Sequence, residues 1–199
     1  MRGAHNALYA GSTPVPSTKL TLLKGNKMLI LIRGLPGSGK STFAKRVSEE
    51  IGLGNYNEAD QFFELIGGFD QKLLDAAHAS CYSHTALELA IEGISIVSNT
   101  FTRFFEMERY LQLAVHFKVP ILIVHMRYDY KSIHDVPEHT LTSMRNRFQT
   151  ESYLKDTIKN NPDWRNNKPD VAYRKIGEYL DHSTEEEVIA FIKNRLEKQ

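Results

Sequence analysis

Cysteine is almost absent from this chain of 199 residues, in which Cys81 is the only one. A single cysteine cannot form a disulfide within the chain, so the class of small disulfide-stapled domains is excluded. The scarcity fits a reducing compartment, and we expect a cytoplasmic location. Cys81 lies in a stretch with helical periodicity, where we expect it to be a small core residue.

A large net charge is also missing, because 25 lysines and arginines face 24 acidic residues and leave a formal charge of +1. There is no global basic field, so any nucleic-acid contact has to come from a local patch. No apolar run approaches the ~20 residues needed to span a bilayer, and we expect no membrane partner. Hydrophobic residues still make up 41% of the chain, which is enough for a substantial core.

Residues 1–26 lack the continuous apolar segment of a secretory signal and contain glycine and proline among small polar residues. We expect them to form a flexible N-terminal extension, followed by a single domain over residues 27–199. Within that domain apolar strand patterns alternate with helical ones. This order predicts an α/β fold with a central parallel sheet flanked by helices.

The strand patterns cover residues 28–33, 55–59, 94–98 and 119–126. The helical patterns cover 41–51, 71–92, 103–117 and 137–149, the last with Pro137 at its first position. Ser183 and Glu186 form a capping box ahead of a final helix. The inward residues expected on the long second helix are Leu73, Leu74, Ala77, Cys81, Leu87 and Ile91.

Residues 34–41 have the sequence Gly-Leu-Pro-Gly-Ser-Gly-Lys-Ser and match G-x-x-x-x-G-K-[ST] at every fixed position. Glycines let successive N–H groups turn toward phosphate oxygens, and the following helix presents its positive end to the same anion. A chance glycine turn is disfavoured by the strand before the motif and the helix after it. The motif predicts a triphosphate and Mg²⁺, with these candidate residues: Gly34, Pro36, Gly37, Ser38, Gly39, Lys40, Ser41 and Thr42.

Asp60 lies twenty residues beyond Lys40, at the end of the expected second strand. Ligands of open α/β sheets bind outside the carboxyl ends of the strands, so Asp60 is a candidate general base and, with Ser41, a candidate metal ligand. A helix cap or turn residue is the structural alternative. Asn99 stands where the third strand ends and a carboxylate is often found. It either contacts the metal through water or caps the next helix with Thr100.

The segment after the fourth strand, residues 126–137, contains cations that could close over a transferred phosphoryl group. Arg127 and Lys131 are the catalytic candidates there, since positive charge offsets the charge that develops on the equatorial oxygens. A solvated polar loop is the competing interpretation.

Four segments together resemble the polynucleotide-kinase-like group of P-loop phosphotransferases, which is related to the zeta-toxin-like kinases. They are residues 34–42, the Asn-Glu-Ala-Asp of 57–60, the Val-Ser-Asn-Thr-Phe-Thr of 97–102, and 133–148 from Ile-His-Asp-Val-Pro onward. The resemblance implies a three-layer P-loop NTPase fold with a helical lid. It also implies a kinase that uses ATP and Mg²⁺ to phosphorylate a hydroxyl, in the best-known case the 5′-hydroxyl of a nucleic acid.

The resemblance carries Asp60 over as the general base and residues 127–134 as the lid. Three positions depart from the pattern. Phe63 replaces the arginine that contacts the acceptor phosphate, Asn99 replaces a strand-end aspartate, and Lys131 replaces an arginine whose planar fork it cannot reproduce.

These departures leave the acceptor open between a nucleic-acid end and a nucleotide. They also keep two alternatives: a nucleotide-dependent switch with slow hydrolysis, and a toxin-type kinase of a nucleotide sugar.

Overall fold

The computed structural model of the chain describes residues 25–128, 136–177 and 181–199. Its centre is a four-stranded sheet in the order β2-β1-β3-β4, and every pairing is parallel. The strands are β1 (Met28–Arg33), β2 (Ile94–Ser98), β3 (Ile121–Met126) and β4 (Val171–Ile176). The first strand in the chain therefore lies inside the sheet, and its carboxyl end is flanked by the ends of β2 and β3.

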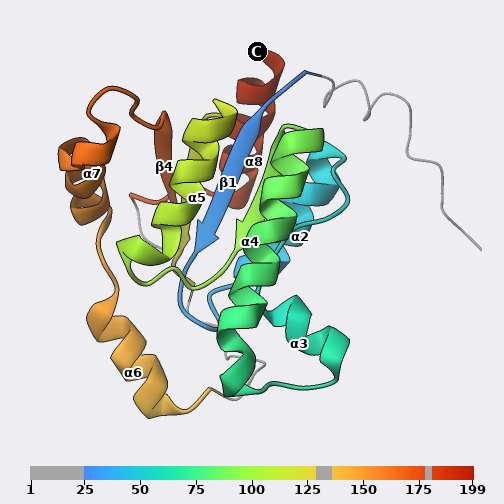
Figure 1. Ribbon diagram of the computed structural model, residues 1–199, viewed down its shortest axis with the longest axis vertical. Helices are drawn as coiled ribbons and strands as arrows, with labels where there is room; N and C mark the ends of the chain where they lie inside the picture. The colour runs from blue at the N-terminus through green and yellow to red at the C-terminus, as the bar shows by residue number, and fades with distance from the viewer. Residues whose placement is uncertain (1–24, 129–135, 178–180) are drawn as a thin grey trace, which may run out of the picture.

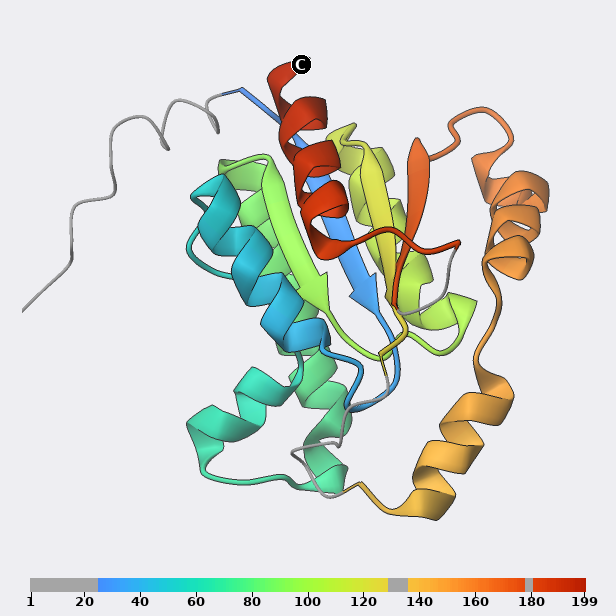
Figure 2. The same ribbon diagram turned by 180° about the vertical axis from the view of Figure 1, so that it is seen from behind.

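Helices cover both faces of this sheet (Figure 1). The helices α2 and α8 pack on one face, and α4, α5 and α7 pack on the other, while α3 and α6 lie beyond the carboxyl ends of the strands (Figure 2). This confirms the expected three-layer α/β fold. The helices are α2 (Lys40–Ile51), α3 (Asp60–Ile66), α4 (Leu74–Ile91), α5 (Phe104–Phe117), α6 (Glu138–Arg147), α7 (Glu151–Asn160) and α8 (Glu185–Glu197), with short 3₁₀ turns η1 (Gln71–Leu73) and η2 (Pro162–Trp164).

Successive side chains of β1 point to opposite faces of the sheet, and the core is correspondingly divided into two layers. Ile30 and Ile32 pack with Phe43 and the other apolar residues of α2 and α8, whereas Leu29 and Leu31 pack against α4 and α5. All six residues of β1 are buried, as expected for a strand covered on both faces. Among the described residues no helix is long and apolar enough to cross a membrane.

The prediction of a second strand at residues 55–59 is wrong in extent. Only Asn57 pairs with the sheet, through an isolated parallel bridge to Val97 at the edge of β2. The side chain of Asn57 turns to α4, where its Nδ2 donates to Glu88 Oε2 at 2.6 Å. The chain leaves the sheet directly afterwards because α3, which the sequence patterns did not predict, begins at Asp60.

Four helix starts differ from the prediction by one residue: α2 begins at Lys40, α5 begins at Phe104, and the starts of α6 and α8 are shifted as well. The capping box of α8 is formed by Thr184 and Glu187 rather than by Ser183 and Glu186. Both pairs satisfy the sequence pattern, but the backbone N–H of Ser183 donates to Lys175 O at 2.8 Å and extends the pairing of β4. Pro137 is the N-cap of α6 and not its first helical residue.

The inward face of α4 was predicted only in part. The buried residues Ala77, Cys81, Thr85 and Leu89 follow a strict four-residue spacing. Leu87 and Ile91 are 57% and 73% exposed because each lies two positions, about 200° around the helix, from a buried neighbour. Leu73 and Leu74 lie at the helix start and are also exposed.

Strand β4 was not predicted, and it adds the outer edge of the sheet beside β3. Its residues are mostly half-buried, so the apolar run typical of a central parallel strand is missing. All described elements from Met28 to Glu197 belong to this one arrangement around the sheet. Residues 1–24 of the expected N-terminal extension lie outside the described residues.

Candidate active site

The phosphate loop connects the carboxyl end of β1 to the start of α2, as the motif predicts. Gly34 lies close to the ends of the neighbouring strands. Its N–H donates to Thr100 O at 3.2 Å. A Cβ at this position would come within 2.5 Å of Ser38 Oγ and 2.6 Å of Met126 O, so only glycine fits. Gly39, the N-cap of α2, has a left-handed φ of 81° and provides no side-chain cap. The first N–H groups of α2 can therefore serve an anion.

Lys40 is the first residue of α2, and its ammonium bends back over the loop. Its Nζ donates to Leu35 O at 2.9 Å. Burial lowers the pKa of Lys40 to about 8, and the negative charges of Glu58 and Asp60 oppose that shift. A bound triphosphate would add further negative charge and favour the protonated form. The loop thus holds a cation whose charge changes around pH 8 in the absence of phosphate.

We expect nucleotide affinity to be constant below about pH 8 and to fall by up to about tenfold per pH unit above it. The sign follows from the lowered pKa, because above about 8 the free lysine is neutral and must take up a proton when phosphate binds. Titration calorimetry with MgATP in buffers of different ionisation enthalpy measures both the affinity and this proton uptake. Lys40→Arg, which stays charged, serves as the control, and a flat affinity profile for the wild type contradicts the assignment.

Glu58 is a residue of this site that the sequence analysis missed. Ser41 Oγ donates to Glu58 Oε2 at 2.7 Å, which leaves the oxygen lone pairs of Ser41 available for a cation. Burial raises the pKa of Glu58, whereas the hydroxyl of Ser41 and the charge of Lys40 lower it. The available signal was its position, two residues before Asp60, in the segment that pairs with β2. Its approach to Ser41 depends on the tertiary fold.

Asp60 is the first residue of α3 and is exposed to solvent. Its charge acts on both Lys40 and Glu58, so the structure brings these three residues and Ser41 together at the carboxyl ends of β1 and β2. In the described part of the chain no cluster of three or more histidine, cysteine or acidic residues could hold a metal by itself. The residues present instead fit Mg²⁺, which is commonly held by one or two protein oxygens together with phosphate and water.

Asn99 does not cap the next helix, because α5 begins at Phe104 with Arg103 as its N-cap. Instead its side chain holds the turn that leads into Asp60. Asn99 Oδ1 accepts a hydrogen bond from the backbone N–H of Ala59 at 3.0 Å, and Nδ2 donates to Cys81 Sγ at 3.4 Å. The amide therefore connects the end of β2 to the start of α3 and to the core of α4.

We expect Asn99→Ala to lower the free energy of unfolding by about 1–3 kcal/mol, since it leaves the buried N–H of Ala59 without its acceptor. Urea denaturation measures the change. Cys81→Ala is the comparison variant, because it keeps the bond to Ala59 but removes the sulfur that accepts from both Asn99 Nδ2 and the Tyr110 hydroxyl. Equal stability of Asn99→Ala and wild type is the contrary result.

Of the two lid cations, the structure describes only Arg127. Its backbone N–H donates to Ile176 O at 2.8 Å, and its Nη1 lies 3.2 Å from His182 Nε2. Arg127 thus stands at the end of β3, next to Met126, whose carbonyl touches Gly34. Its catalytic role stays a prediction, and Lys131 lies outside the described residues.

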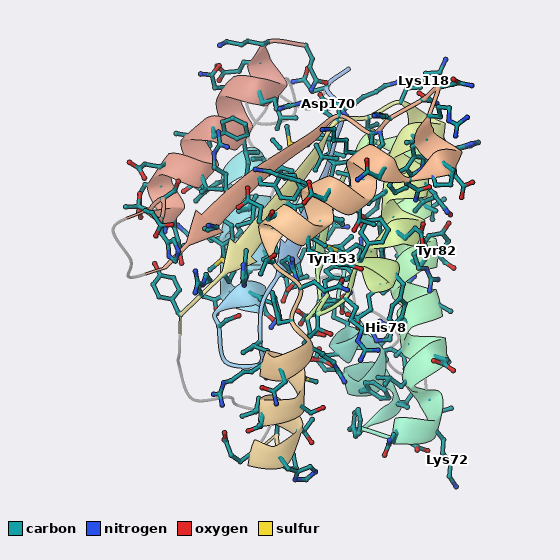
Figure 3. All side chains as sticks on the ribbon, turned by 90° about the vertical axis from the view of Figure 1, so that its left-hand side faces the viewer. Lys72, His78, Tyr82, Lys118, Tyr153 and Asp170 are labelled. Carbon is teal, nitrogen blue, oxygen red and sulfur yellow. The ribbon has the colours of Figure 1, made fainter. Side chains whose placement is uncertain are left out.

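A cavity of about 530 Å³ lies at the opposite end of the sheet and is unconnected with these residues. Figure 3 shows Lys118 and Asp170 of its lining at the far end from His78 and α6. Lys118 caps the carboxyl end of α5, and Arg195, which pairs with Asp170, lies in the last turn of α8. Cations at helix carboxyl ends offset the helix dipole, which explains this basic lining without a ligand.

The parallel sheet, the phosphate loop between β1 and α2, and the carboxylates beside it define a P-loop kinase-like protein. Residues 29–150, more than half of the chain, match the AAA_33 family model, described as an AAA domain. The chain therefore belongs to the AAA_33 family. This confirms the expected kinship with P-loop kinases and accounts for the chain as far as the end of α6.

Individual known proteins are also similar to this chain. NEDD4-binding protein 2 of Homo sapiens is 32% identical over 135 residues, which cover 61% of this chain but only 8% of that protein. The solved structure of Chaetomium thermophilum Kti12 with ADP-AlF3 has a TM-score of 0.54 at 16% identity, covering 84% of this chain and 98% of that one. A Chloroflexus aurantiacus structure has a TM-score of 0.53 at 15% identity, covering 87% and 97%. At such identities these structures show the fold alone.

Proposed function

We propose that the protein is an ATP- and Mg²⁺-dependent phosphotransferase that moves the γ-phosphate to a hydroxyl acceptor. The observation that carries the proposal is the convergence of Lys40, Ser41, Glu58 and Asp60 at one edge of the sheet. A loop that only binds a nucleotide needs the lysine and the serine. An exposed aspartate beside them adds a group that can accept a proton from an attacking hydroxyl.

Each residue has a distinct part in the proposed reaction. The backbone of the loop and Lys40 bind and orient the phosphates. Ser41, oriented by its hydrogen bond to Glu58, would hold Mg²⁺, which when bound neutralises charge on the β- and γ-phosphates. Asp60 would take the proton of the acceptor hydroxyl as that oxygen attacks the γ-phosphorus, while the bond from the γ-phosphorus to the β–γ bridging oxygen breaks and ADP leaves.

The acceptor we propose is a nucleic-acid 5′-hydroxyl or a nucleotide, as the resemblance implies. Phe63 cannot bind an acceptor phosphate, because it is only 5% exposed and packs with Ala59 and Ala77. Cations on the other side of the site could take that role. Arg103 is exposed at the start of α5, and Arg147 lies in the last turn of α6 together with Arg145, whose Nη1 pairs with Glu138 Oε1 at 2.9 Å. Positive charge there supports an acceptor that carries phosphate.

The test is a transfer assay with γ-labelled ATP, Mg²⁺ and a panel of acceptors: 5′-hydroxyl RNA and DNA oligonucleotides, nucleosides and sugar nucleotides. We expect label on at least one acceptor, and loss of that label in Lys40→Ala. Lys45→Ala removes an exposed lysine from the same helix and should leave transfer unchanged. Label released only as phosphate, with no labelled acceptor, would overturn the kinase assignment in favour of a nucleotide-dependent switch.

A further inference from the structure

Arg33 is a buried charge in the last position of β1, directly before the phosphate loop. It is only 1% exposed, and burial lowers its pKa to about 10, so it stays protonated at neutral pH. Arginine is rarely this deeply buried unless it has partners. Ile32 faces the α2 side of the sheet, so the alternation of the strand directs Arg33 to the opposite face.

The partner on that face is Phe148, which follows α6. The guanidinium carbon of Arg33 lies 4.1 Å from the centroid of the Phe148 ring. His125, paired with Arg33 across β1 and β3, stacks on the same ring at 4.7 Å and an interplanar angle of 16°. Burial, together with the nearby Arg33 charge, lowers the pKa of His125 to about 3, so this histidine is neutral. Phe148 therefore contacts one residue from each of two neighbouring strands, and of these only Arg33 is charged.

Gln149 fixes the same segment by its backbone. Arg33 Nη2 donates to Gln149 O at 3.0 Å, and Gln149 N donates to Thr102 O at 2.8 Å. The Gln149 side chain accepts from the N–H of Phe104 at the start of α5. Arg147 Nε adds a bond of 3.1 Å to Thr102 Oγ1. Residues 147–149 are thus attached to β1 and to the loop after β2, both of which contribute to the candidate active site.

Helix α6 itself has no buried residue and lies beyond the sheet, away from the helical layers (Figures 1 and 2). We infer that Arg33 is a positioning residue, which sets the place of α6 relative to the phosphate loop by holding Phe148 and Gln149. The backbone that continues from Arg33 into Gly34 and the side chain that holds the end of α6 belong to one residue. The inferred consequence for phosphate transfer rests on the proposed function, whereas the placement of α6 does not.

The placement is measured by the distance between two spin labels, introduced as Ser143→Cys on α6 and Ser83→Cys on α4, both exposed. The only native cysteine is buried, so labelling is selective. We expect one narrow distance distribution in the otherwise wild-type protein, broadened in Arg33→Met and in Phe148→Leu. Arg33→Lys keeps the charge but not the planar stacking group and should give an intermediate width.

The matched control is Arg174→Met. The Arg174 guanidinium lies 4.0 Å from the Phe191 ring centroid, so its loss removes a comparable cation–π contact between β4 and α8. It should leave the label distribution unchanged even if it lowers stability. A distribution that is unchanged in both Arg33→Met and Phe148→Leu overturns the inference.

The kinetic consequence is a split between binding and turnover. In the transfer assay kcat should fall by about tenfold in Arg33→Met and Phe148→Leu, while the Kd of MgATP stays that of the wild type. A change in nucleotide Kd with an unchanged distribution of spin-label distances would mean that Arg33 supports the phosphate loop itself, and it would contradict the proposed role. If the wild type transfers no label to any acceptor, the proposed function fails, and the distance measurement still decides the placement of α6.

Discussion

Asp60→Asn is expected to lower the rate of phosphate transfer by about 10²–10⁴-fold while the protein still binds MgATP. The amide keeps the size of the carboxylate but cannot accept the proton of the attacking hydroxyl. Asp60 is exposed at the start of α3, so the substitution removes no core packing. Single-turnover transfer of label and equilibrium binding of ATP, measured on the same preparation, separate the two effects.

Two side effects of this substitution need a control. The negative charge of Asp60 raises the pKa of Lys40, so its loss moves that pKa further below its present value of about 8. Measurement near pH 7 rather than pH 8 reduces the difference in lysine protonation between the two proteins. Asp75→Asn removes a carboxylate from the first turn of α4, and so reproduces the loss of a favourable helix-dipole contact without touching the site. Transfer by Asp60→Asn at the rate of Asp75→Asn contradicts the general-base role.

The phosphate loop could be predicted because all of its parts are adjacent in the sequence. A buried strand, a glycine loop and a helix start follow one another over residues 28–51, and each has its own local signal in the sequence. The parallel pairing of β1, β2 and β3 was predicted from the alternation of apolar strand patterns with helical ones, whereas their order in the sheet was not predicted. Other local patterns were less decisive, because the strand at 55–59 and the inward face of α4 were also predicted from neighbouring residues and were wrong in part.

What the sequence could not supply was the contact between separate segments. Glu58 lies in a polar stretch, and nothing in that stretch shows that its carboxylate reaches the hydroxyl of Ser41. Strand β4 has the half-buried pattern of an edge and was missed for that reason. Arg33 is the last residue of a strand predicted from its apolar residues, yet its partners Phe148 and Gln149 are more than a hundred residues away.

Asn99 shows how these contacts change the interpretation of the site. In the sequence it is an amide where a carboxylate is often found, which suggested either a metal contact through water or a helix cap. In the structure its amide holds the backbone of Ala59, and the acidic group beside Ser41 is Glu58 from the adjoining segment. Ser41 therefore has an acidic partner, Glu58, in the segment that pairs with the edge strand β2.

Because Glu58, and not the residue at the end of β2, is the acidic group beside Ser41, it is the second residue whose loss should have a large effect. We expect Glu58→Ala to raise the Mg²⁺ concentration required for half-maximal transfer by about 10–100-fold, as is typical when a residue that orients a metal ligand is removed. Glu58→Gln keeps an oxygen that can accept a hydrogen bond from the Ser41 hydroxyl but loses the charge, so its Mg²⁺ requirement should lie between those of Glu58→Ala and the wild type. The ratio of the Mg²⁺ concentrations that the two variants require for half-maximal transfer separates the orientation of Ser41 from the electrostatic attraction of the cation.

The matched control is Glu64→Gln on α3. Glu64 is exposed and contributes negative potential at Glu58, but Ser41 donates to Glu58 and not to it. Its removal tests whether a general loss of negative charge near the site is sufficient to change the Mg²⁺ requirement. Because burial raises the pKa of Glu58, Mg²⁺ that favours the ionised carboxylate should lower that pKa, and the wild-type Mg²⁺ requirement should therefore fall as pH rises. A pH-dependent requirement that persists unchanged in Glu58→Gln would assign the effect to another group and remove Glu58 from the metal site.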